Sequence, residues 1–245
     1  VEFNKMCSPN APEAPSCIVR WEGGNDYTIW ASSQSPFIYK LYNGPRIPKS
    51  QLRVKTFNVG GSYGNKQTMS VTTLCCAIAA IKTGRPVKLV LNKHEQFAAY
   101  EQRLGSKIRA KIGMTEDGIF NAVQGCWYVD TGCLGDAVQG QVGVGLGEAQ
   151  LVMAKCKNWD LDSKVVVTNK AAAGIVRGYG GQELNSCLAR NMAHCMMQAD
   201  KDPVECFKKN YVAPGDKYYW RDGLIWQSRG SSHYPETMQK AADKF

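Results

Sequence analysis

The sequence has few of the features that mark membrane or secreted proteins. Its longest apolar run, LCCAIAAI at 74–81, is far too short for a bilayer span of roughly 20 residues. No signal-peptide pattern opens the sequence given. Histidine occurs only three times and no C-x-x-C pair is present, so a zinc site built from these ligands is not expected. We therefore expect a soluble, cytoplasmic protein without a membrane span.

The ten cysteines lack the spacing of a disulfide framework. Cys75 and Cys76 are adjacent, and Cys187 and Cys195 fall in a stretch that we expect to be helical. This scatter favours reduced, mostly buried thiols over disulfides.

Dense basic runs are also missing, although the net charge is +9. The charge leaves open an anionic partner, such as a phosphate-bearing cofactor or an acidic subunit, or simply a solvated surface. Without a basic cluster, nucleic acid is not the expected partner.

What the chain does contain is a globular composition, 44% hydrophobic and 21% charged, with short alternating segments between glycine and proline turns. The pattern predicts an α+β fold of mixed sheets with packed helices. We expect strands at 16–22, 26–31, 51–59, 87–91, 107–113, 119–130 and 163–168. We expect helices from Pro36 to Gly44, at 68–83, at 182–201, from Pro203 onward and at 235–245.

The order of these segments predicts three local arrangements. The first two strands form a hairpin, and so do the strands at 107–113 and 119–130. The segments 51–59, 68–83 and 87–91 read as a right-handed βαβ unit. The glycine-rich stretch at 132–148 reads as a functional or ordered loop.

Two glycine–tyrosine turns stand out. NVGGSYGNK at 58–66 precedes an expected helix, and RGYGGQE at 177–183 precedes another. Glycines let a backbone approach a ligand closely, and a helix N-terminus favours an anion. Neither turn matches the Walker A pattern or G-x-G-x-x-G. On spacing alone, structural turns and two grips on one anionic ligand both remain open.

A series of motifs in fixed order resolves this choice by resemblance. The series comprises SSQSPF around Gln34, GGSYGNK at 60–66, TGRPVKLVLNKHEQF at 83–97, TNKAAAGIVRGYGGQE at 168–183 and DKDPVECFKKN at 200–210. It resembles the molybdenum-binding subunit of the xanthine dehydrogenase and aldehyde oxidase family, the molybdenum hydroxylases. The resemblance implies the family's first molybdenum cofactor-binding domain at 1–211. Residues 212–245 would then be an extension toward a second such domain.

The resemblance also implies roles for individual residues. Gln34 and Arg177 would be catalytic, with Gln34 beside the apical ligand of molybdenum. The cofactor would be bound by Gln34, Gly60, Gly61, Ser62, Tyr63, Gly64, Arg177 and Gly178. The substrate would contact Tyr63, Gln67 and Tyr179. Gln67 stands where xanthine-oxidising members carry a glutamate, which puts xanthine in doubt as the substrate.

The implied cofactor is molybdopterin, with the cytosine dinucleotide form left open, and its dithiolene would hold the metal without protein ligands. The family's glutamate base would lie on another chain, because Glu148 in GLGE precedes the second turn instead of following it. Expected partners are that second molybdenum-binding subunit, an iron–sulfur subunit and a flavin (FAD) subunit. Such a complex would hydroxylate an aldehyde or N-heterocycle, and this chain alone would be inactive. The alternative is a scaffold module that kept the fold and lost the metal.

Overall fold

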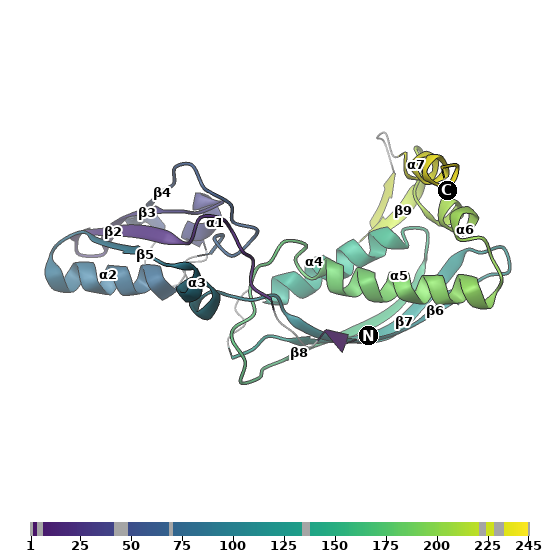
Figure 1. Cartoon of the computed structure of the whole chain (residues 1–245), viewed down its shortest axis with the longest axis horizontal. Coiled ribbons are helices and arrows are strands. Elements are labelled where there is room, and N and C mark those ends of the chain that lie inside the picture. Colours follow the sequence, from purple (N-terminus) through teal and green to yellow (C-terminus); the bar gives the residue numbers. More distant parts are fainter. Residues whose placement is uncertain are drawn as a thin grey trace. The chain divides into compact units, whose positions relative to one another are not determined.

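The computed structural model describes residues 2–3, 7–41, 49–68, 71–133, 138–220, 224–227 and 233–244. The chain forms two compact units, each built from separated segments (Figure 1). Unit 1 contains Val1–Lys5, Leu104–Asn169 and Gly178–Phe245, and unit 2 contains Met6–Arg103 and Lys170–Arg177. Both combine a mixed sheet with helices, which confirms the predicted α+β class. The predicted boundary after residue 211 stays a prediction.

Unit 2 is built on a four-stranded sheet in the order β4-β3-β2-β5. Strands β2 (Ser16–Gly23) and β3 (Asp26–Ala31) form the predicted hairpin. β4 (Leu52–Lys55) pairs parallel with β3, and β5 (Val87–Val90) pairs antiparallel with β2. β4 and β5 therefore run in the same direction at opposite edges. The predicted βαβ unit thus exists only in a split form, with two other strands between its own.

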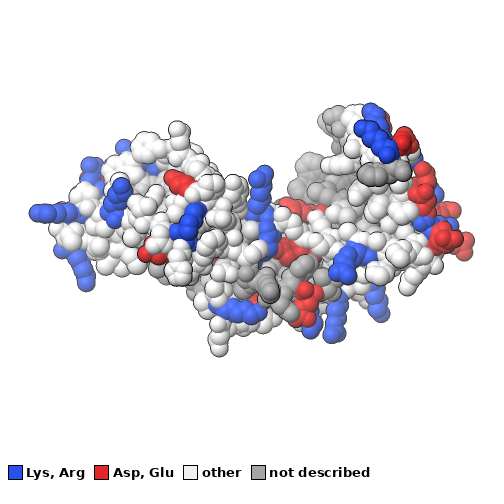
Figure 2. All heavy atoms as spheres, in the orientation of Figure 1, with Lys and Arg blue, Asp and Glu red and all other residues white. Residues whose placement is uncertain are grey.

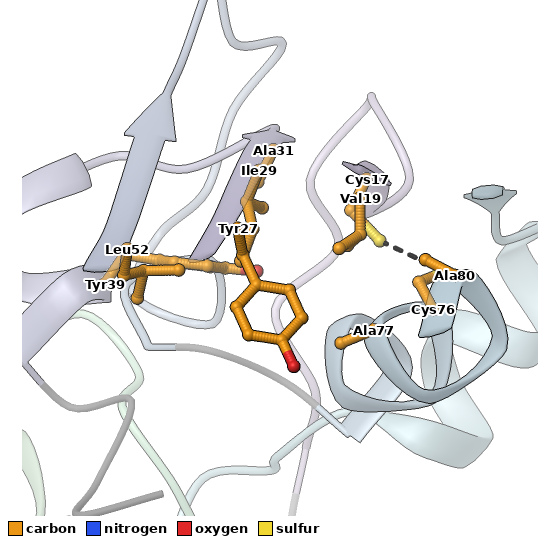
Figure 3. Close-up of a cluster of buried hydrophobic side chains, with 10 residues drawn as sticks. All are labelled: Cys17, Val19, Tyr27, Ile29, Ala31, Tyr39, Leu52, Cys76, Ala77 and Ala80. Atoms are coloured by element: carbon orange, nitrogen blue, oxygen red, sulfur yellow. Dashed lines mark hydrogen bonds between the residues drawn. The ribbon is translucent and has the colours of Figure 1, made fainter. Parts of the chain in front are cut away.

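One face of this sheet is covered by helix α2 (Val71–Thr83). Figure 3 shows Cys17 and Val19 of β2 directed toward Cys76 and Ala80 of the helix. The small residues of α2 allow this close approach, and the Sγ atoms of Cys17 and Cys76 lie 3.7 Å apart. All ten cysteines, each within the described residues, are free thiols, as predicted.

Unit 1 contains a second four-stranded sheet, in the order β1-β6-β7-β8. β6 (Gly105–Met114) and β7 (Phe120–Asp130) form the second predicted hairpin. β8 (Asn158–Val166) runs parallel to β7, and the short β1 (Glu2–Phe3) pairs with β6 at the opposite edge. Helices α4 (Val138–Val152) and α5 (Gly181–Gln198) pack together over this sheet (Figure 1).

Helix α4 corrects the prediction of a loop at 132–148. It spans Val138–Val152, and residues 134–137 of the stretch lie outside the described residues. Glycine costs a helix about 1 kcal/mol relative to alanine, which is why the sequence reads as a loop. Packing explains the glycine at 145, since a Cβ there would lie 2.9 Å from the Gly180 carbonyl carbon and from the Trp127 ring. Close contact with the start of α5 (Gly181–Gln198) therefore requires a helix without side chains at this point.

The remaining elements are short. Helix α6 (Pro203–Asn210) begins at Pro203, as predicted, and the side chain of Asp202 caps its start. Helix α3 and the β9–β10 hairpin were not predicted, and the expected end of α1 at Gly44 lies outside the described residues. The bounds are α1 Pro36–Leu41, the 3-10 turn η2 Lys49–Gln51, α3 Lys93–Ala99, α6 Pro203–Asn210, β9 Lys217–Trp220, β10 Leu224–Gln227 and α7 Tyr234–Ala242.

Two surface properties bear on partners. Within the described residues, no helix combines the length and the apolar character that a membrane crossing requires. On the face drawn in Figure 2, Lys and Arg side chains lie singly or in small groups among uncharged ones. This distribution agrees with the lack of dense basic runs in the sequence.

Candidate functional site

The first glycine turn holds the side chain of Gln34. The Oε1 atom of Gln34 accepts hydrogen bonds from the Ser62 hydroxyl and from the Gly64 backbone N–H, the latter over 3.0 Å. Its Nε2 atom donates to Oε1 of Gln67 over 3.0 Å. Its backbone N–H donates to the Lys66 carbonyl over 3.3 Å. The structure thus brings together four residues that the resemblance places at one site: Gln34, Ser62, Gly64 and Gln67.

The lysine of this turn points inward. The Lys66 side chain is only 1% exposed, and its Nζ lies 2.8 Å from Glu13 Oε2. The same carboxylate accepts from the Gly60 N–H over 2.9 Å. Burial opposes ionisation of Glu13, but the hydrogen bonds from Lys66 and Gly60 outweigh it and lower the pKa of this carboxyl group. Lys66 is therefore a structural cation of the turn.

The turn has a strained backbone that glycines make possible. Tyr63 has a φ of +56°, which is unusual for a residue with a side chain, and its side chain is 42% exposed. Its hydroxyl lies 3.3 Å from the position that a Cβ on Gly61 would take, so the ring folds back over its own turn. Gly64 has a φ of +114°, and a Cβ there would lie 2.3 Å from the Ile175 carbonyl oxygen. Only glycine fits at position 64.

Arg177 of the second turn is joined to the first turn within unit 2. Its backbone N–H donates to the Tyr63 carbonyl over 2.8 Å, and its own carbonyl accepts from Arg103 over 2.8 Å. The Arg177 residue is exposed, and so is Gln34. These bonds fix the position of the Arg177 backbone and leave its side chain at the surface.

The rest of the second turn belongs to unit 1 and repeats the same backbone pattern. Tyr179 has a φ of +47° between Gly178 at +92° and Gly180 at +94°. Gly180 then serves as the N-cap of α5 without a side-chain cap. A tyrosine in the left-handed region, followed directly by a glycine with positive φ, is thus common to both turns.

Two glutamates stand beside the start of α5. The carboxylate of Glu148 on α4 packs against Gly181, where an added Cβ would lie 1.9 Å from its Oε2. Burial, and secondly the charge of the nearly buried Glu183, raise the pKa of Glu148. These carboxylates already place negative charge at the helix N-terminus, so this end is less suited to an anion than the sequence alone indicates.

One polar side chain of the first turn, Asn65, is buried without a hydrogen-bond partner among the described residues. Asn65 is 3% exposed, and neither of its amide atoms has a hydrogen-bond partner among the described residues. A buried amide without partners costs about 1–3 kcal/mol. A polar group from outside the described residues would satisfy it.

Sequence reasoning missed Glu13, Arg103 and Ile175. Their contacts with the turns join segments that are far apart in the chain, and no local sequence pattern predicts such contacts. The hydrogen bond between Lys66 and Glu13, for example, spans 53 residues.

A cavity of about 600 Å³ lies on the other face of the unit 2 sheet, lined by residues that include Ile18, Trp30 and Lys88. Glu13 is among its lining residues, but Gln34, Tyr63 and Gln67 are not. The cavity is therefore not the site formed by these three residues.

In a comparison with protein families, residues 4–211 match a model described as the molybdopterin cofactor-binding domain. Among curated proteins, the chain is 27% identical over 245 residues to the "Probable hypoxanthine oxidase XdhD" of Escherichia coli strain K12, covering 99% of this chain and 25% of that protein. It is 29% identical over 222 residues to the "Nicotinate dehydrogenase large molybdopterin subunit" of Eubacterium barkeri, covering 89% of this chain and 50% of that subunit.

Solved structures show the same fold. The aldehyde oxidoreductase from Desulfovibrio gigas superposes with a TM-score of 0.79 at 23% identity, covering 100% of this chain and 27% of that one. Quinoline 2-oxidoreductase from Pseudomonas putida 86 superposes with a TM-score of 0.76 at 22% identity, over 100% of this chain and 32% of that one. The chain thus spans 25% of the length of the hypoxanthine oxidase relative.

Proposed function

We propose that this chain, which belongs to the molybdopterin cofactor-binding domain family, binds molybdopterin as one component of a molybdenum hydroxylase. In this role it forms part of an active site that oxidises an aldehyde or an N-heterocycle. The observation that carries the proposal is the attachment of Gln34 to the first glycine turn, which is itself bonded to Arg177.

The residues present fit such a cofactor. The buried amide of Asn65 has no hydrogen-bond partner within the part of the chain that the structure describes, and a pterin carries both hydrogen-bond donors and acceptors. The amide of Gln34 is neutral, so it would donate a hydrogen bond to the cofactor without adding charge. When bound, the cofactor supplies the two-electron oxidation.

The chain's own residues would bind the cofactor and orient the substrate. The first turn, Gly60 to Gly64, would present its backbone to the cofactor, with Gly178 contributing from the second turn. Gln34 would hold the oxygen beside the metal, and Arg177 would provide positive charge nearby. Tyr63 and Tyr179 would contact a planar substrate through their rings, and Gln67 would contact its polar edge.

Other parts of the reaction are proposed to come from outside residues 1–245. These are a glutamate base in a second molybdenum-binding domain, iron–sulfur clusters and a flavin. Whether the cofactor carries a cytosine nucleotide is part of the same proposal and is read directly by mass spectrometry of the extracted cofactor. Residues 1–211 would form the first part of the cofactor-binding region, and 212–245 would lead toward the second.

Metal analysis of the enzyme assembled with its partner subunits tests the proposal. We expect about one molybdenum atom per complex, together with a pterin released on denaturation. A correctly assembled complex without molybdenum or pterin would support a scaffold role instead.

Substitution of Gln34 tests the site. Gln34→Ala should retain molybdenum and lower kcat by about 10-fold or more, the range expected when a group that orients a metal ligand is lost. Gln124→Ala is the matched control, because Gln124 also makes an exposed side-chain hydrogen bond, to Asp160 on the unit 1 sheet. Equal rates for the Gln34 variant and this control would remove Gln34 from the catalytic residues.

A further inference from the structure

The hydrogen bonds around Gln34 fix the direction in which its amide points. The nitrogen and oxygen of a glutamine amide are hard to tell apart by shape, so a neighbour must decide between them. Here the neighbour is the Gly64 backbone N–H, 3.0 Å away, which can only donate. The atom that faces it must be the carbonyl oxygen of Gln34.

Ser62 fixes the same direction independently. The Lys66 backbone N–H donates to Ser62 Oγ over 3.2 Å, and this bond uses a lone pair of the hydroxyl. The hydroxyl proton is then free to go to Gln34 Oε1, the other atom with which Ser62 is hydrogen bonded. Two backbone N–H groups, on Gly64 and Lys66, therefore fix the same orientation of the Gln34 amide.

The orientation of the Gln34 amide also determines the orientation of the Gln67 amide. Because the oxygen of Gln34 faces the turn, its Nε2 faces Gln67, and this nitrogen can only donate. The atom of Gln67 that lies 3.0 Å away must therefore be its own carbonyl oxygen. The Nε2 of Gln67 is left over, and within the described residues no hydrogen bond engages it.

The two amides consequently present donors and no acceptor. Gln34 keeps one N–H beyond the bond to Gln67, which in the proposed function is directed at the cofactor, and Gln67 keeps two, which are left for the substrate. Gln34 is exposed and Gln67 is partly exposed, so both remain within reach of a ligand. The side-chain amides of Gln34 and Gln67 are both uncharged.

We propose that Ser62, Gln34 and Gln67 form a directional amide relay that selects substrates presenting a hydrogen-bond acceptor, such as a carboxylate or carbonyl oxygen or an unprotonated ring nitrogen. A substrate that presents an N–H group at this point leaves two donors facing each other, and it is rejected. Ser62 is a positioning residue, since it acts through Gln34. The inference rests on the proposed function and deepens it by naming the substrate class.

A glutamate at position 67 would reverse this polarity. One of its oxygens would accept from Gln34 Nε2, as Gln67 does now, and the other would face the ligand as an acceptor. Gln67→Glu therefore changes the preference of the site without removing the bond to Gln34.

The test measures binding to the assembled, molybdenum-loaded enzyme by calorimetry without an electron acceptor. The probes are pyridine-3-carboxylate, which offers only acceptors on its side group, and pyridine-3-carboxamidine, a cation of the same shape that offers only donors. We expect the natural enzyme to bind the carboxylate at least 10-fold more tightly. In Gln67→Glu the ratio of the two dissociation constants should shift toward the amidine by at least 10-fold.

Two further variants separate the relay from a simple charge effect. Gln67→Leu removes the donors without adding charge and should lower the ratio of the two dissociation constants several-fold, leaving only the preference that the positive charge of Arg177 gives the anionic probe. Ser62→Ala should reduce the preference for the carboxylate several-fold, and Ser62→Thr, which keeps the hydroxyl, should restore it. Gln67→Leu also replaces Gln67→Glu if the latter does not retain the metal.

Failure of the relay and failure of the proposed function would give different results. Molybdenum-loaded variants with unchanged probe ratios, or a loaded natural enzyme that binds neither probe, would overturn the relay. A natural complex that contains no molybdenum would instead count against the proposed function.

Discussion

The backbone N–H of Arg177 donates a 2.8 Å hydrogen bond to the carbonyl oxygen of Tyr63. This bond joins the first glycine turn to a segment that returns to unit 2 late in the sequence. The segment is also tied down by the Gly174 N–H, which donates to the Gln102 carbonyl over 2.9 Å, and by the Ile175 N–H, which donates to Glu101 over 3.2 Å. The candidate site in unit 2 is thus assembled from two stretches that depend on each other.

The first prediction concerns Gly64, where these stretches are closest. Gly64→Ala places a Cβ 2.3 Å from the Ile175 carbonyl oxygen and forces a side chain into a φ of +114°. We expect a loss of about 3 kcal/mol or more of unfolding free energy, because neither the backbone oxygen nor the strained dihedral can relax locally. Urea denaturation measures this loss.

Gly24→Ala is the control for Gly64, since its φ is +54° but nothing lies within 4 Å of the added Cβ. It should cost only the strain of the left-handed conformation, about 1 kcal/mol. Equal costs for the two variants would show that the Ile175 contact is not tight.

The second prediction concerns the ion pair of Glu13 and Lys66. Glu13→Ala leaves a cation whose side chain is only 1% exposed without its partner. Removal of one partner from a buried pair costs about 3–5 kcal/mol, but Glu13 itself is 35% exposed, so solvent screening lowers the expected loss to about 1–3 kcal/mol. Asp162→Ala, which breaks the exposed pair with Lys164, should change the denaturation midpoint little.

The third prediction is the pH dependence of that pair. The folded pKa of Glu13 is lower than its ordinary value of 4.5, so the stabilisation is complete above about pH 4.5 and is lost as the pH falls through the folded pKa. Denaturation curves at a series of acidic pH values should show this loss in the natural protein. They should show less of it in Glu13→Gln, and identical curves would exclude this contribution.

The fourth prediction compares two glycines of α4. Gly143→Ala should stabilise the protein by about 0.5–1 kcal/mol, since nothing lies within 4 Å of the added Cβ and alanine favours a helix. Gly145→Ala should destabilise it in spite of the same helix preference, because its Cβ would meet Gly180 and Trp127 at 2.9 Å. Thermal denaturation of both variants decides this, and two changes of the same sign would contradict it.

The fifth prediction concerns two neighbouring thiols. Burial, together with the nearby Cys17, raises the pKa of Cys76 to about 12, whereas Cys75 is exposed. Since the thiolate is the reactive form, iodoacetamide at neutral pH should modify Cys75 and leave Cys76 unmodified in the folded protein. Mass spectrometry of the peptides reads the two sites, and unfolding in urea should make both reactive.

The sequence allowed both hairpins to be predicted, because each depends on alternation of side chains and a glycine turn close by. Helix α4 could not be predicted, since its glycines are unfavourable locally and the close contact that requires glycine at position 145 forms only in the folded protein. Helix α3 was predictable in principle, because Asn92 and Glu95 form a capping box that is visible in the sequence.

For the candidate site, the glycine–tyrosine turns were visible because glycine clusters are rare and local. The orientation of Gln34 was not, because it is decided by the N–H groups of Gly64 and Lys66 far along the chain. The same holds for Glu13, whose hydrogen bond to Lys66 depends on the fold bringing the two segments together.

The division of unit 2 into two chain segments has a consequence for biosynthesis. Residues 170–177 leave the ribosome only after the strands of unit 1 between 104 and 166 have been made. Until then the Tyr63 carbonyl cannot accept the hydrogen bond from the Arg177 N–H, and the first turn lacks this contact. A nascent chain arrested before residue 170 should accordingly contain the sheet of unit 2 without the hydrogen bond that joins the first turn to Arg177, and a cofactor bound as proposed would be inserted only after that point in synthesis.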